Sequence, residues 1–265
     1  KKLLDNFLKK YIKNGNIYCV LFLNGGYIMG RKWNNIKYQK AANDKQRSKI
    51  YSKFGIEIYA AAKSEPDPEI NRNLKMVIEK AKTYNVPREI IERAIEKAKG
   101  FGGEDYSFHR YEGYGPGGSA IIVDCLTNNV NRTVSEVRST FSKHGGTLGV
   151  SGSVTFMFDN TAIVSAKGIT EDAVLEALIN FDCEVSEIEN EDGEVTTYGA
   201  MEDFQKIRSA YQSLGVNEFT TSEIVMLPKN YIQLEGEAKD KFLRLIDALE
   251  DLEDVQNVFH NVMLD

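Results

Sequence analysis

The spacing of the apolar residues changes near residue 100, and this change limits the folds open to the chain. Before it, apolar residues recur three or four positions apart, as in "IYSKFGIEIYAAA" (50–62), which is the spacing of one face of a helix. Beyond it, short apolar runs such as "SAIIVDCLT" (119–127) alternate with helical stretches and glycine-containing turns, as strands do. The sequence therefore predicts an α+β fold in which the helices come first.

Three helices are expected in the N-terminal part of the chain. The first covers residues 34–63. The second is expected to begin at Pro68, with Asp67 as its N-cap, and to bury Ile70 with the apolar residues that follow at helical spacing. The third follows Pro87 and ends at a glycine. We expect these helices to pack into one small domain.

The glycine-rich run "GFGGED" (100–105) is expected to link the helices to two sheets. The first sheet begins with a strand, a helix and a second strand, "SVTFMF" (153–158). From Thr161 to residue 228 the pattern is strand, helix, strand, strand, helix, strand, which is the ferredoxin-like unit. The tail adds the strand "YIQLE" (231–235), a helix, and the strand "VQNVFHNV" (255–262). These three elements could complete the first sheet.

The expected architecture is an N-terminal three-helix domain followed by two ferredoxin-like α/β sandwich domains, one inserted in the other. The expected boundaries are 29–100 for the basic helical domain, 101–159 with 229–265 for a discontinuous middle domain, and 160–228 for the inserted domain. Residues 1–28 are expected to be a non-native upstream extension of the reading frame. Gly25 and Gly26 can be encoded by a bacterial ribosome-binding sequence, at about the usual distance before a start codon at Met29.

Charge is divided unevenly along the chain. The formal net charge is −6, yet residues 30–100 hold 17 basic and 9 acidic side chains, whereas residues 101–265 hold 11 basic and 29 acidic ones. The densest basic stretch runs from Gly30 to Lys53, where eight Lys/Arg stand against Asp44 alone. A basic end on an acidic body is typical of a protein that binds a polyanion, although a merely uneven solvated surface would have the same composition.

The basic stretch also contains aromatic residues, which nucleic-acid-binding surfaces use for stacking on bases. Lys45, Lys49 and Lys53 are four residues apart and so share one face of a helix. Trp33 either stacks on a base or closes the helical domain as an apolar contact. The candidate nucleic-acid-binding residues are Arg31, Lys32, Trp33, Lys37, Lys40, Lys45, Arg47, Lys49 and Lys53.

No catalytic residue, metal site, cofactor or small-molecule substrate is expected. None of the three histidines has HExxH spacing or a cysteine nearby. The loop "EGYGPGGSA" (112–120) precedes a strand and lacks the residues of a nucleotide fingerprint; it is expected to be a turn, or else a contact loop for RNA. Three cysteines without a CxxC motif indicate a reducing compartment, and no apolar run reaches the roughly 20 residues of a membrane span.

Two stretches are recognisable as those of a known family: "MGRKWNNIKYQKAANDKQRSKIYSKFGIEIYAAAKSEPDPEINRNLKMVIEKAKTYNVPREIIERAIEKAKG" and "YEGYGPGGSAIIVDCLTNNVNRTVSEVR". Through them, from Met29 to its end, the chain closely resembles the YebC family of transcriptional regulators. The "GRKW" opening, with Arg31 where many members have His-Ser-Lys-Trp, resembles the YeeN-like branch. The resemblance implies a three-domain cytoplasmic protein without catalytic activity or cofactor. Bacterial members are described as DNA-binding regulators, a mitochondrial relative activates translation of cytochrome oxidase, and the family has been linked to stalled ribosomes.

The expected function is therefore non-enzymatic regulation of gene expression by nucleic-acid binding. We expect the basic helical domain to bind ribosomal RNA or the ribosome and so to regulate translation, because the acidic body would be repelled by a long duplex. One alternative is a transcriptional regulator that binds promoter DNA, since a basic three-helix domain can also dock on DNA. Another is an acidic module that recruits a protein partner.

Overall fold

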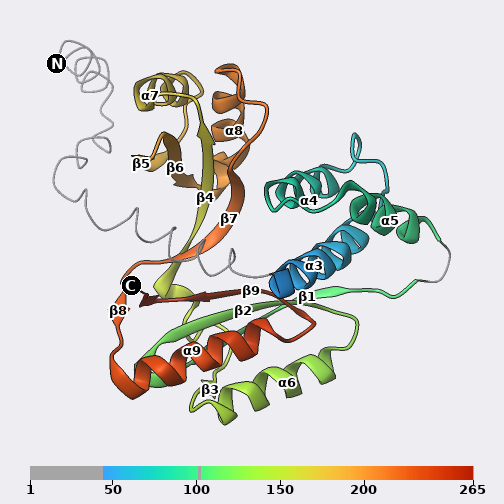
Figure 1. The fold of residues 1–265 in the computed structure, drawn as a ribbon, viewed down its shortest axis with the longest axis vertical. Coiled ribbons are helices and arrows are strands. Elements are labelled where there is room, and N and C mark those ends of the chain that lie inside the picture. The colour runs from blue at the N-terminus through green and yellow to red at the C-terminus, as the bar shows by residue number, and fades with distance from the viewer. Residues whose placement is uncertain (1–43, 101–102, 265) are drawn as a thin grey trace.

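The structure is a computed structural model that describes residues 44–100 and 103–264. Its first described elements are three helices, α3 (Asp44–Ala62), α4 (Arg72–Thr83) and α5 (Arg88–Lys99), which Figure 1 shows grouped on one side of the molecule. Their apolar faces enclose one core that includes Phe54, Ile58 and Leu74. Residues 34–43 of the expected first helix, and the expected extension 1–28, lie outside the described residues.

Helix α4 begins four residues later than its expected start at Pro68. The carbonyl of Asp67 accepts the backbone N–H groups of Ile70 and Asn71 at 3.1 and 2.8 Å, so this segment forms a turn. Asn71 is the N-cap: its Oδ1 accepts the N–H of Leu74 at 3.0 Å, and its Nδ2 donates to the carbonyl of Ala61 at 2.8 Å. Because Asn71 also holds the end of α3, the helix starts there, and Ile70 is 70% exposed rather than buried.

A four-stranded antiparallel sheet, here the middle sheet, follows the helices. Its strand order is β3 (Thr147–Leu148), β1 (Ser107–Tyr114), β2 (Ala120–Thr127) and β9 (Val255–His260). Helices α6 (Val130–Lys143) and α9 (Gly236–Glu250) cover one face of it, as Figure 1 shows. The core beneath them includes Val123, Phe141 and Leu245. A strand from the end of the chain thus pairs with β2, some 130 residues earlier.

Three details of this sheet differ from the expectation. Strand β1 was not predicted, because "SFHRYEGY" has no clear apolar alternation; it forms by pairing with all eight residues of β2. The expected strand 153–158 is instead a short 3-10 turn, Thr155–Met157, ahead of a strand that starts at Phe158. Of the expected strand 231–235, only β8 (Ile232–Gln233) pairs, in parallel, with β10 (Val262–Met263).

Buried Glu112 explains why the expected strand at 153–158 does not form. Its carboxylate accepts the backbone N–H groups of Gly152, Val154 and Thr155 at 2.7, 2.8 and 2.8 Å. These donors are therefore not available to a strand ladder, and the chain turns around the carboxylate instead. Within the same region, "EGYGPGGSA" forms the expected turn: Pro116–Gly118 is a 3-10 turn that joins β1 to β2.

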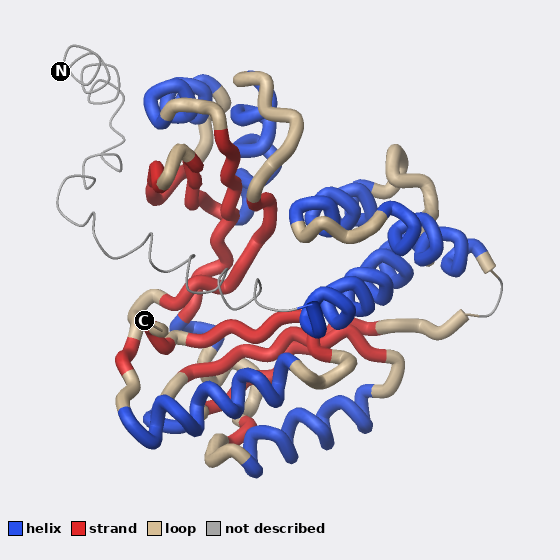
Figure 2. Tube along the Cα trace, in the orientation of Figure 1, coloured by secondary structure: helices blue, strands red, loops and turns tan. Residues whose placement is uncertain are grey.

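A second antiparallel sheet, here the inserted sheet, lies between β3 and α9 in the chain. Its elements are β4 (Phe158–Lys167), α7 (Glu171–Asn180), β5 (Val185–Glu191), β6 (Glu194–Ala200), α8 (Phe204–Ser213) and β7 (Thr221–Pro228). The strand order β5-β6-β4-β7 is that of the ferredoxin-like unit. Figure 2 shows its long strands running down to the middle sheet, where Ile163 and Val225 share a core with Ile122 and Phe259. The α+β prediction, with helices first and two antiparallel sheets after them, is confirmed.

Candidate nucleic-acid interface

The structure describes only part of the predicted basic surface. Arg31, Lys32, Trp33, Lys37 and Lys40 lie outside the described residues, and for Lys45 the backbone of α3 is described but the side chain is not. Arg47 is exposed on α3. Lys49 and Lys53 lie one turn apart on the same helix face, as their spacing predicted.

The face with Lys49 and Lys53 is turned toward the C-terminal end of α9. Lys49 forms an ion pair with Asp251, the C-cap residue of α9. Lys53 Nζ donates to the backbone carbonyl of Glu250 at 3.0 Å. The last carbonyls of a helix have no partner within the helix and carry partial negative charge, so both lysines lie where a cation is stabilised. Residues about 200 positions apart meet here, and no local pattern could have indicated this contact.

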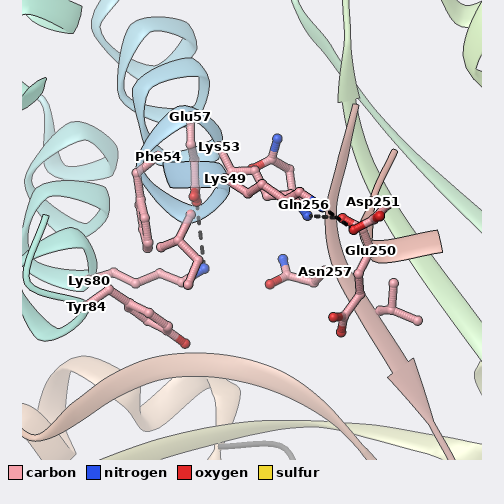
Figure 3. A pocket seen from close by; sticks show the side chains of 12 residues that line it. Lys49, Lys53, Phe54, Glu57, Lys80, Tyr84, Glu250, Asp251, Gln256 and Asn257 are labelled. Atoms are coloured by element: carbon pink, nitrogen blue, oxygen red, sulfur yellow. Dashed lines mark hydrogen bonds and ion pairs between the residues drawn. The ribbon is translucent and has the colours of Figure 1, made fainter. Parts of the chain in front are cut away.

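A cleft lies between α3 and α4 on one side and β9 with the end of α9 on the other (Figure 3). Its walls combine the two lysines with an aromatic pair, Phe54 and Tyr84, whose ring centroids are 5.2 Å apart at 49°. Asn257 and Gln256 of β9 present amide side chains from the opposite wall. Cations, aromatic rings and amides are the groups that bind phosphates and unpaired bases.

Tyr84 and Lys80 were missed by the sequence analysis and belong to this cleft. Lys80 Nζ lies 3.9 Å from Glu57 Oε1 and 3.8 Å from Glu223 Oε2. The hydroxyl of Tyr84 donates to Glu223 Oε1 at 2.9 Å, and burial together with this carboxylate raises the pKa of Tyr84 well above its usual value. Glu223 lies on β7, so these contacts also hold the helices against the inserted sheet.

Both cysteines in the described part of the chain are free thiols. Burial raises the pKa of the Cys125 thiol to about 12 and that of Cys183 to about 11, so neither is a thiolate near neutral pH. Among residues 44–100 and 103–264, no group of three or more His, Cys, Asp or Glu could hold a metal ion. Within the same ranges, no helix has both the length and the apolar character to cross a membrane.

Comparison with known proteins gives matches along nearly all of the described chain. Residues 31–101 match the model of the TACO1/YebC protein N-terminal domain. Residues 106–262 match the model of the TACO1/YebC second and third domain. The chain is also similar to a conserved hypothetical protein from Aquifex aeolicus, of which a crystal structure is known. The two sequences are 37% identical, the alignment covers 83% of this chain and 91% of the other, and the TM-score is 0.69.

Proposed function

Since this chain belongs to the TACO1/YebC family, whose members are nucleic-acid-binding proteins of the transcription-regulator type, we propose that it regulates gene expression by binding ribosomal RNA through its basic helical region. The resemblance read from the sequence is thereby confirmed at the level of the family. In this proposal the protein acts in the cytoplasm, on RNA or on the ribosome, and catalyses no reaction itself.

The observation that carries the proposal is the separation of charge between the helices and the two sheets. Residues 44–100 hold 13 basic and 9 acidic side chains, and residues 103–264 hold 11 basic and 28 acidic ones. The basic residues 31–40 add four more positive charges immediately before α3. A polyanion is therefore attracted to the helices and repelled by both sheets, which limits its approach to one end of the molecule.

The orientation of α3 supports RNA over duplex DNA. A recognition helix enters a major groove only if its base-reading face projects from the protein. The face with Lys49 and Lys53 instead looks onto the end of α9. An unpaired RNA loop can bend into a cleft that a rigid duplex cannot enter, and its phosphates and base edges would meet the two lysines and Asn257 there. The rings of Phe54 and Tyr84 are packed in the core of the helices and support this wall of the cleft.

Promoter DNA remains the second candidate, because the exposed Arg47 and the basic residues before it could bind the backbone of a duplex without using the cleft. A protein partner for the acidic sheets is a third. The salt dependence of binding separates the third from the other two. Each phosphate that the protein neutralises steepens the log–log slope by about 0.7 on single strands and about 0.9 on duplex DNA, whereas binding to a protein partner would depend much less on salt.

The test uses a double variant, Lys49→Gln with Lys53→Gln, and a charge-matched control, Lys82→Gln with Arg93→Gln, at exposed positions of α4 and α5. Binding is measured by fluorescence anisotropy to an RNA stem-loop with an unpaired loop and to duplex DNA, at several salt concentrations. We expect the cleft variant to make the salt slope on RNA shallower by about 1.4, and the control to change it much less. Equal effects of the two variants on RNA would contradict the proposal.

A further inference from the structure

We propose that the C-terminal end of α9 is an internal competitor for nucleic acid, which occupies Lys49 and Lys53 in the free protein and is displaced when a phosphate backbone binds α3. This inference rests on the proposed function, because it concerns how that surface is regulated. In the structure, the two lysines are held by the carboxylate of Asp251 and the carbonyl of Glu250.

The end of α9 resembles a phosphate backbone in the groups it offers. Asp251 supplies a full negative charge, and the terminal carbonyls of the 15-residue helix supply a partial one. The exposed Glu253, two residues further on, adds a second negative charge. A lysine binds phosphate as a point charge and donates hydrogen bonds to its oxygens, so it can exchange either partner for a phosphate oxygen.

The C-terminal end of α9 is held in place by its own contacts, so it is the lysine side chains that must move when nucleic acid binds. Asp254, three residues beyond the C-cap of α9, is buried and accepts hydrogen bonds from Thr133 Oγ1 at 2.6 Å and from Arg132 Nη2 at 2.8 Å. The backbone carbonyl of Asp254 accepts the N–H of Leu126 at 2.8 Å. The end of α9 is thereby joined to β2 and α6, whereas a lysine side chain is a flexible four-carbon stem.

The contact is weak enough to be reversed. The Lys49 side chain is 40% exposed and that of Asp251 66% exposed, and exposed ion pairs are screened by solvent and salt. A nucleic acid that offers several phosphates at once replaces both contacts and adds others. A single small anion replaces only one of these contacts. The competitor therefore makes the lysines more selective for extended polyanions over free phosphate.

The first experiment compares Asp251→Asn with Asp240→Asn, which lies on the same helix about three turns away. Both variants remove one negative charge from α9, but only the first removes the contact with Lys49. We expect Asp251→Asn to bind the RNA stem-loop about twofold to fivefold more tightly than Asp240→Asn. One outcome separates this inference from the proposed function: the unmodified protein binds the RNA stem-loop and Lys49→Gln weakens this binding, but the two Asp variants bind the RNA alike. That result would refute the internal competitor and leave the proposed function standing.

The second experiment follows the contact itself in the unmodified chain. A carbodiimide joins a lysine amine to a carboxylate that touches it, and peptide mass spectrometry identifies the product. We expect a Lys49–Asp251 cross-link in the free protein and its loss on saturation with the RNA stem-loop, whereas the Lys241–Glu237 pair within α9 should cross-link equally in both states. Persistence of the Lys49–Asp251 product on saturated protein would overturn the inference. Absence of RNA binding by the unmodified chain would overturn the proposed function and this inference with it.

Discussion

Arg208 of α8 and Glu79 of α4 form an ion pair, with Nη2 and Oε2 2.5 Å apart. The guanidinium also lies 5.1 Å from the centre of the Phe219 ring and 5.7 Å from that of Phe204. Arg208 is only 6% exposed, so its charge is largely withdrawn from water. The pair therefore contributes to holding the helical region against the inserted sheet, and with it the walls of the cleft.

Removal of the Glu79 carboxylate should destabilise the fold. We expect Glu79→Ala to lower the free energy of unfolding by about 3 kcal/mol, because a buried guanidinium loses its counter-ion. Glu92→Ala is the matched control, since Glu92 is also in a helix and pairs with Arg88, but both side chains are more than half exposed. The control should change the free energy by less than about 0.5 kcal/mol. Urea denaturation measures both, and similar values would show that Arg208 is not held by Glu79.

The three N–H groups around Glu112 give a second prediction. We expect Glu112→Ala to lower the free energy of unfolding by about 3 kcal/mol, since several buried donors lose their acceptor. Glu112→Gln keeps one acceptor oxygen and should cost less. Chemical denaturation at neutral pH compares the two, and a Gln variant as unstable as the Ala variant would show that the charge, rather than the acceptor geometry, is what matters.

The same carboxylate predicts a response to acid. Burial raises the pKa of Glu112, but hydrogen bonds from Thr155, Gly152 and Val154 outweigh it, so the pKa lies below its usual value of 4.5. A lowered carboxyl pKa stabilises the fold above the unfolded-state pKa, and this stabilisation is lost as the pH falls further. We expect the unmodified chain to lose stability below about pH 4.5 and Glu112→Gln to lose less there. Parallel curves of stability against pH would contradict this.

His260 should make stability depend on pH in a higher range than Glu112 does. It is buried against Phe242, with ring centroids 5.0 Å apart, and burial lowers its pKa from 6.5 to about 4, although a backbone hydrogen bond with Val262 raises it. Between these values the unfolded chain takes up a proton that the folded chain does not, so stability falls as the pH decreases from 6.5 to 4. We expect His260→Gln to flatten that part of the curve. Thermal melts at several pH values measure the slope, and an unchanged slope would exclude His260 as its source.

Trp33 stays a prediction of the sequence, since it lies outside the described residues. If its indole stacks on an unpaired base, Trp33→Ala should cost about 1–3 kcal/mol of binding to the RNA stem-loop and leave duplex DNA binding unchanged. Trp33→Phe keeps an aromatic ring and should recover much of the loss. Two results together would favour the DNA-binding alternative. One is normal RNA binding by Trp33→Ala, and the other is loss of promoter binding when Lys45, Lys49 and Lys53 are replaced by Glu.

Local patterns determined much of this protein. Apolar residues at helical spacing, among them Phe54 and Ile58 in α3 and Leu74 in α4, predicted that the helices pack together. A helix turns the same face to the core every three or four residues. The strands of the inserted sheet could be predicted for a similar reason, because each is apolar enough to be recognised singly. Ile163 and Val225, on two of these strands, are both buried. The α+β class, the family and the shared face of Lys49 and Lys53 all follow from the residues themselves.

Tertiary structure decided which distant groups meet. Strand β1 exists through its pairing with β2, since its own residues are largely polar, and the turn at 155–157 exists because a carboxylate on β1 takes the donors around it. The partner of Lys49 is Asp251, 202 residues away. A side chain's spacing predicts whether it faces a core or solvent, but many acidic residues could satisfy one lysine. Only the folded chain selects among them, because the packing of α3 and α9 around the middle sheet brings one carboxylate within reach.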